Sequence, residues 1–270
     1  MAVLVRGTQV FVGGRFAGVG DVAAANVAVY KAAPGVISRG ILFDPSGVTE
    51  SDGIAGAGGG SWHALGEGVK GQVYALAAGA ATDMYAAGRF HLAGGVHVEN
   101  VARWQSVEGA VGGGYWVGLV DSDCLRLKAG VCGVNGDVWA LVFVGEYLYV
   151  GGQFSVAGGK PAHNVARFFS GTWESVGKGV DGAVYVLTAI RIQGTLAGSC
   201  IYHAGDFSKV EDARGVMQAS GLARWCIGDP GTVLTVDGSS AQGGGLTEFW
   251  ETVAVPDGVL SVRALAPHND

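Results

Sequence analysis

The chain has 270 residues, a formal net charge of −6 and only 15% charged residues. It contains no basic run or arginine-rich segment, so a nucleic-acid partner is not expected. The apolar stretches are of strand length and are interrupted by glycine, and none reaches the roughly 20 residues that span a bilayer. With 49% apolar residues the chain can bury a substantial core, and we expect a single domain over residues 1–270.

A pattern of 21 residues occurs three times, beginning at Val10, Met84 and Leu148, and a looser fourth copy begins at Ile201. Self-similarity of this kind indicates one supersecondary unit that buries its apolar face only when a neighbour stacks on it. A second pattern alternates with the first and opens on a tryptophan each time: Trp62, Trp116, Trp173 and Trp250. Together the two patterns contain four short apolar runs, which predict four strands per unit.

These units follow one another along the chain, and we expect them at about residues 1–66, 67–119, 134–177 and 178–253. Second, third and fourth strands occur four times, but five segments qualify as a first strand: 2–5, 73–76, 138–142, 184–188 and 259–265. Segment 259–265 therefore predicts a closing strand, contributed by one end of the chain to the unit at the other end. The alternative is a piece of a larger ring of sheets, in which 259–265 is an exposed edge where another chain docks.

Glycines end an apolar run of the repeated pattern. A glycine pair stands there in two copies, Gly13-Gly14 and Gly151-Gly152, and an Ala-Gly pair ends at Gly88 in another. Glycine permits a positive φ or a close backbone approach that a Cβ atom would prevent. A phosphate-binding loop is the alternative, but a second glycine-rich element and a following helix are both missing. We therefore expect these glycines to serve backbone geometry.

Aromatic residues recur at fixed places in the repeats. One phenylalanine follows the glycine pair, or its Ala-Gly equivalent, in every copy: Phe16, Phe90, Phe154 and Phe207. Trp104 and Trp225 end the third run, where Tyr30 and Phe168 stand in the other units. Because one aromatic residue replaces another, we expect packing between strands and sheets and not a ligand platform at these positions.

Two polar residues recur as well. An asparagine stands ten residues after the phenylalanine in three units, at Asn26, Asn100 and Asn164. Asparagine tolerates turn conformations and bonds nearby backbone, which predicts a loop clip before the third strand, with a polar binding ring as the alternative. Gly221 replaces it in the fourth unit, where we expect the longer loop to close differently. An arginine precedes the end of the third run at Arg103, Arg167 and Arg224, and a ring contact or salt link is expected.

The order VYAL, LYVGGQF, NVARF and W-x-x-V resembles the four-stranded blades of kelch-like β-propellers. It is more similar still to the delta-60-type repeats of bacterial surface proteins and of the fungal cortical-marker family. Those repeats carry GG-x-F, an AGG-like turn, an Asn-x-Ala-x-aromatic strand and a W-x-x-L-G-x-G-x-x-G-x-V close. The resemblance covers nearly all of the chain apart from its insertions. It implies an all-β propeller of four-stranded antiparallel blades, and it supplies no catalytic residues. Together with the unit count above, we expect four blades closed by strand exchange.

The four cysteines fall into two local pairs. Cys124 and Cys132 bracket an inserted loop, whereas Cys200 opens a second strand and Cys226 follows a third strand of the same unit. Two disulfides and an oxidising compartment, extracellular or at the cell surface, are expected, and free buried thiols are the alternative. Zinc is disfavoured because neither a C-x-x-C pair nor a suitably spaced histidine accompanies the cysteines. The N-terminus shows no basic region or cleavage site of a secretory signal.

No motif predicts an enzyme, a metal site or a cofactor. The six histidines, His63, His91, His97, His163, His203 and His268, fall at unrelated places in the repeats, except that His97 and His163 both lie between a second and a third strand. We expect solvated loop residues at these positions. Asp121 and Asp123 point only faintly to calcium, because the glycine and distal glutamate of an EF-hand loop are missing. The sequence also contains no G-x-S-x-G elbow and no paired-carboxylate motif.

Besides the insertion bracketed by Cys124 and Cys132, insertions at residues 31–61, 208–220 and 227–249 distinguish the copies, and we expect loops draped over the surface there. Variable loops on a rigid frame are common sites of partner binding. The sequence therefore predicts a structural scaffold for protein–protein interaction, bound through these loops or the edge at 259–265, within a larger surface or filamentous assembly. The alternative is a carbohydrate-binding or carbohydrate-active propeller, which exposed aromatic and carboxylate side chains at a central pore would favour.

Overall fold

The computed structural model describes residues 1–32, 60–79, 82–107, 109–127, 132–190, 199–228 and 248–254. The chain divides into two compact units, Met1–Leu119 and Val120–Asp270, and each is described by itself. Nearly all of the regular structure is antiparallel β-sheet, which confirms the all-β prediction. The predicted closing strand 259–265 and most of the insertions 31–61 and 227–249 lie outside the described residues. The single domain over 1–270 stays a prediction.

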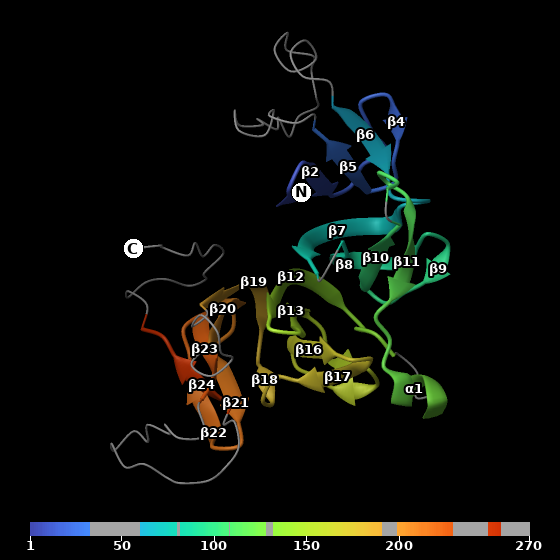
Figure 1. Cartoon of the computed structure of the whole chain (residues 1–270). Coiled ribbons are helices and arrows are strands. Elements are labelled where there is room, and N and C mark those ends of the chain that lie inside the picture. Colours follow the sequence, from blue (N-terminus) through green and yellow to red (C-terminus); the bar gives the residue numbers. More distant parts are fainter. Residues whose placement is uncertain are drawn as a thin grey trace. The chain divides into compact units, whose positions relative to one another are not determined.

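The unit Met1–Leu119 holds two main antiparallel sheets (Figure 1). The first has the order β1 (Ala2–Arg6), β2 (Gln9–Gly13), β5 (Val27–Lys31) and β6 (Ser61–Ala64). The second has the order β7 (Val69–Ala78), β8 (Met84–Ala93), β10 (Val101–Ser106) and β11 (Gly114–Gly118). Three short strands belong to the loops after β2 and β8: β3 (Gly18–Val19), β4 (Val22–Ala23) and β9 (Val96–His97).

The unit Val120–Asp270 repeats this arrangement. Its first sheet has the order β12 (Asp137–Val144), β13 (Tyr147–Gln153), β16 (Val165–Phe169) and β17 (Thr172–Ser175). Its second has the order β19 (Ala183–Ile190), β20 (Cys200–Asp206), β23 (Leu222–Ile227) and β24 (Glu248–Thr252). The remaining elements are α1 (Ser122–Leu127), β14 (Val156–Ala157), β15 (Lys160–Pro161), β18 (Gly179–Val180), β21 (Lys209–Asp212) and β22 (Gly215–Gln218).

All four sheets lay their main strands in chain order, as the repeated pattern predicts. The first strands expected at 2–5, 73–76, 138–142 and 184–188 fall within β1, β7, β12 and β19. One prediction about an insertion was wrong. Residues 208–220 are not a draped loop, because β21 and β22 pair as a hairpin that joins β18 in a three-stranded sheet. Side chains alternate between the two faces of this hairpin, so Val210 is buried while Val216, which is paired with Glu211, stays 56% exposed.

An aromatic pair joins the third and fourth strands of every sheet. In each case the aromatic that ends the third strand lies directly opposite the tryptophan that opens the fourth: Tyr30 and Trp62, Trp104 and Trp116, Phe168 and Trp173, Trp225 and Trp250. The ring centroids are 5.0–5.3 Å apart. Directly opposed aromatic residues are among the stronger cross-strand pairs. The prediction that these residues pack together is therefore confirmed.

The recurring phenylalanines also belong to the interior. Phe90, Phe154 and Phe207 are 3–6% exposed, whereas Phe16 is half-buried against a smaller cluster around Val12. Phe90 joins a core with Val73 and Trp104, and Phe207 joins the corresponding core of the other unit. Each phenylalanine thus contributes apolar burial.

The glycine pairs serve two separate close approaches, and none of the five repeat glycines has a positive φ. A Cβ atom at Gly13 or Gly151 would lie 2.6 or 2.7 Å from a valine of the neighbouring sheet, Val73 or Val184. A Cβ atom at Gly152 would lie 2.0 Å from the carbonyl oxygen of Asp137 on the adjacent strand. Of the two roles expected for these glycines, close approach is the one that the backbone uses.

We predict that Gly152→Ala destabilises its unit by about 2–3 kcal/mol, because the added methyl group meets backbone that cannot rotate away. Gly14 occupies the same place in the first sheet, but a Cβ there would have no neighbour closer than 3.6 Å. Gly14→Ala should therefore change stability little. Urea unfolding followed by intrinsic fluorescence measures both variants, and equal midpoints would contradict the steric explanation.

Candidate functional site

An asparagine clasp holds the start of the third strand in three sheets. Asn26, Asn100 and Asn164 have φ of 65°, 65° and 66°, so the residue that tolerates the left-handed region stands where it is needed. Each side-chain Oδ1 accepts a hydrogen bond from the backbone N–H of the repeat phenylalanine, at 2.8–3.1 Å. This confirms the predicted loop clip.

The clasp also reaches the chain beyond its own sheet, at β7 in one case and at β18, the short strand before β19, in the other. Asn26 Nδ2 donates to the Val69 carbonyl at 2.7 Å, and Asn164 Nδ2 donates to the Val180 carbonyl at 2.9 Å. In the fourth sheet, Gly221 has φ of 73° and bonds the Phe207 carbonyl through its backbone N–H, as the asparagines do with their own phenylalanines. The expectation that this loop closes differently was therefore wrong for the backbone. Only the side-chain amide is missing.

A second clasp was not foreseen from the sequence. Asn135 Oδ1 accepts from the backbone N–H groups of Ser155 and Val156, both at 3.0 Å. Asp181 holds the same place one sheet later and accepts from Ser208 and Lys209 N–H at 2.7 and 2.8 Å. Burial opposes ionisation of Asp181, but these bonds outweigh it and lower its pKa. The tripeptides V-N-G at 134–136 and V-D-G at 180–182 could have predicted this second clasp. The equivalent tripeptide at 69–71 has Lys70 in the middle, which hides the pattern.

Two open hollows adjoin at this end of the unit Val120–Asp270. Asn135, Gln153 and Ser155 line one of about 400 Å³, and Lys209, Glu211 and Val216 line the other, of about 270 Å³. His163 and Asn164 line both. Lys178 Nζ bonds Glu211 Oε1 at 2.7 Å in the smaller hollow. Mixed charges and amides beside exposed apolar surface are suited to binding a partner or ligand.

Two buried aspartates support the tryptophans of this unit. Asp121 is 0% exposed, and its Oδ2 accepts from Trp173 N–H at 2.9 Å and from Lys160 Nζ at 3.1 Å. Asp212 is 3% exposed, and its Oδ2 accepts from Trp250 N–H at 2.9 Å and from Arg214 at 2.7 Å. Burial raises the pKa of both carboxyl groups, but the hydrogen bonds and the cations bring each below its ordinary value.

Asp121 therefore has a structural role. Its Oδ1 accepts from the N–H groups of Asp123 and Cys124 at the start of α1. Asp123 instead faces Arg126 at 3.4 Å. The described residues contain no group of three His, Cys, Asp or Glu side chains arranged to hold a metal ion.

The recurring arginines make the ring contacts and salt links that the sequence predicts. Arg167 bonds Glu174 at 2.8 Å and Glu248 at 2.5 Å. Burial opposes its charge, but the bonds to Glu248 and to the Tyr149 hydroxyl raise its pKa above the ordinary value. Arg103 has a longer contact of 3.7 Å with Asp83. Arg167 thus links its own sheet, through Glu174 on β17, to the next sheet, through Glu248 on β24.

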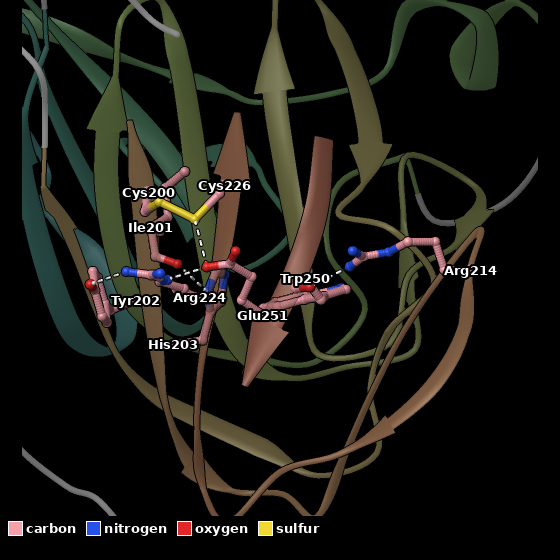
Figure 2. The surroundings of a disulfide bond; sticks show 9 residues. All are labelled: Cys200, Ile201, Tyr202, His203, Arg214, Arg224, Cys226, Trp250 and Glu251. Carbon is pink, nitrogen blue, oxygen red and sulfur yellow. Dashed lines mark hydrogen bonds and ion pairs between the residues drawn. A yellow bond between two sulfur atoms is a disulfide. The ribbon is translucent and has the colours of Figure 1, made fainter. Parts of the chain in front are cut away.

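Both predicted cysteine pairs are disulfides. Cys124 joins Cys132, and Cys200 joins Cys226, with Cα atoms 5.4 and 4.2 Å apart. Cys200 and Cys226 are directly opposed on β20 and β23. Figure 2 shows Arg224 between Tyr202 and Glu251 beside this bond, with hydrogen bonds of 3.0 Å to the phenol and 2.5 Å to the carboxylate.

A fully buried histidine lies next to the same disulfide. His203 Nδ1 is 2.9 Å from the Ile201 carbonyl oxygen, while Nε2 has no hydrogen-bond partner among the described residues. Its ring packs edge-on against Trp250, with centroids 4.7 Å apart (Figure 2). Burial lowers the pKa of His203 to about 3. The prediction of a solvated loop residue was therefore wrong for His203, because it lies within β20 and faces the core, whereas His97 and His163 are exposed as expected.

His203 should make the fold sensitive to mild acid. Its pKa is about 3 when folded and about 6.5 when unfolded, so the unfolded chain binds the extra proton between these values and stability falls as the pH falls through this window. We expect His203→Val, which copies Val150 of the preceding sheet, to flatten the dependence of the unfolding free energy on pH between 6 and 4. Urea unfolding at several pH values measures it, and equal slopes for both proteins would refute this role.

No known family model matches the chain, and no curated protein matches it either. The described residues contain no helix of the length and apolarity needed to cross a membrane.

Proposed function

We propose that the chain is a β-propeller with four blades and that it serves as a non-enzymatic scaffold that binds other protein chains. The supporting observation is how the repeats use their residues. The shared glycines, aromatic pairs and asparagines make contacts within and between the sheets, whereas the exposed residues differ between copies. A frame that is constant inside and variable outside suits recognition.

Packing within each unit supports the propeller. β7 contacts β1 and β2 of the preceding sheet, and β19 contacts β12 and β13 in the same way. Sheets that stack face to face through their first strands are the building principle of propeller blades. The similarity to delta-60-type repeats points to the same architecture.

The hairpin β21–β22 is the partner surface that we favour. It lies between β20 and β23 in the chain and joins β18 in a three-stranded sheet of its own, it lines the smaller hollow, and it carries the exposed Val216 beside the charged Lys209 and Glu211. An apolar residue bordered by charges is typical of a protein-binding surface. The two disulfides favour an extracellular or cell-surface location.

Purification of the native protein with its partners, followed by native mass spectrometry, tests the scaffold role. We expect a mass larger than that of one chain, and we expect Val216→Asp to release the partner. Val96→Asp is the matched control, because Val96 is similarly exposed, at 46%, on β9 of the other unit. A lone chain at all concentrations would contradict the scaffold, and equal effects of the two variants would exclude the hairpin.

A further inference from the structure

Three first strands contain a bulge at the same place, and an aromatic residue is the extra residue each time. The pairing of β7 with β8 jumps from Val73 to Ala75, which leaves out Tyr74. The pairing of β12 with β13 leaves out Trp139, and that of β19 with β20 leaves out Tyr185. A bulge redirects a side chain and interrupts the ladder, so its repetition with one kind of residue indicates a use for that residue.

These bulged aromatics are not part of the buried core. Trp139 and Tyr185 are only half-buried, whereas Trp173 and Trp250 are 0% exposed. Within the unit Val120–Asp270 the two bulged rings lie together, with centroids 4.9 Å apart and planes inclined by 39°. The Trp139 indole N–H makes no hydrogen bond within the described part of the chain. The pair therefore presents partly exposed ring surface with a free donor.

A variable polar residue accompanies each bulged aromatic. It is the residue before the repeat phenylalanine, and it pairs with the residue two places before the aromatic: Arg89 with Gln72, Gln153 with Asp137, and Asp206 with Ala183. All three are exposed. In the fourth sheet the association is direct, because the Tyr185 hydroxyl donates to Asp206 Oδ2 at 2.6 Å. Gln153 also lines the larger hollow.

We propose that Trp139 and Tyr185, with Gln153 and Asp206, form a binding site for a neutral saccharide. Aromatic faces attract the C–H groups of a sugar ring, and an amide with a carboxylate can bond its hydroxyl groups as donor and acceptors. Asp206 and the net charge of −6 disfavour phosphate and acidic ligands. The two rings pack against each other at a tilt and do not enclose a space. This disfavours a quaternary ammonium ligand, which is typically bound inside a cage of aromatic rings. This site does not depend on the scaffold role.

Titration with neutral hexasaccharides tests the site, using cellohexaose, hexa-N-acetylchitohexaose, laminarihexaose and mannohexaose with calorimetry and tryptophan fluorescence. We expect at least one to bind and Trp139→Ala to weaken it about tenfold or more, because truncation of a central aromatic anchor commonly costs this much. Trp139→Phe should retain most of the affinity. Gln153→Ala, at an exposed position, should weaken binding or change which sugar is preferred without altering the urea midpoint.

Tyr115→Ala is the matched control, since Tyr115 is 57% exposed on β11, outside the proposed site. It should bind as the unmodified protein does. Absence of binding to all four sugars at 10 mM, equal affinity of Trp139→Ala and the unmodified protein, or displacement of the sugar by tetramethylammonium would each overturn the proposal.

Discussion

Replacement of Asn164 by alanine is expected to destabilise the unit Val120–Asp270 by about 3 kcal/mol. Two hydrogen bonds disappear, one from Phe154 N–H and one to the Val180 carbonyl, and alanine must adopt the φ of 66° that asparagine tolerates. These bonds tie the loop at Phe154 to β18 at Val180, so their loss loosens the contact between two segments of the chain. Urea unfolding measures the free energy, and hydrogen exchange of the segment that contains Phe154 reports the clasp itself.

Asn164→Gly separates the two contributions. Glycine accepts the positive φ without strain but restores neither hydrogen bond, so its cost should be smaller, about 2 kcal/mol. Gly221 holds this place in the fourth sheet with the same backbone bonds, which shows that glycine fits there. If alanine and glycine destabilise equally, strain contributes nothing. If glycine costs nothing, the side-chain bonds are not important to the fold.

Asp121→Ala is the second change with a large expected effect, about 3–4 kcal/mol of destabilisation. The carboxylate is fully buried and satisfies the N–H groups of Asp123, Cys124 and Trp173, which alanine would leave without an acceptor. Lys160 also loses its partner, but its side chain is 48% exposed and can return to water. Lys160→Ala should therefore cost less than about 1 kcal/mol.

The free energy of unfolding of Asp121→Ala, Lys160→Ala and the double variant separates the contribution of the backbone hydrogen bonds from that of the ion pair. A cost for Lys160→Ala close to that for Asp121→Ala would mean that the ion pair, and not the backbone bonds, carries the stability. Because the pKa of Asp121 is lowered in the fold, its contribution is present above the unfolded value of about 3.8 and is lost as the pH falls below it.

The repeated pattern was sufficient to predict the sheets, because copies that align residue by residue expose the positions that the frame requires. The strand order, the aromatic pairs and the asparagine clasp follow from those positions. Both disulfides were predicted instead from the local placement of the cysteines, which the other copies do not share. The supports of the tryptophans were not predictable in the same way. Asp121 and Asp212 perform one task for Trp173 and Trp250 from unrelated places in the repeat, so no alignment of copies brings them together.

The bulged aromatics were missed for a different reason. Tyr74, Trp139 and Tyr185 stand in runs such as VYAL whose apolar character predicts a strand, and a strand pattern does not reveal that one residue is left out of the ladder. His203 was missed because it occupies a place that is Val150 in the preceding sheet. Its burial is evident only when the neighbouring Trp250 is seen to cover it.

The close contacts of Val73 with Gly13 and of Val184 with Gly151 also limit how a chain of this kind can gain or lose sheets. Gly13 and Gly151 leave room for Val73 and Val184, but the same place in the second and fourth sheets is Ala87 and Ala204, so glycine and alanine alternate along the chain. Within a unit, alanine at the position of Gly13 or Gly151 would place its methyl group against a methyl group of Val73 or Val184. Gene duplication or deletion of a sheet pair preserves this alternation, whereas gain or loss of a single sheet breaks it.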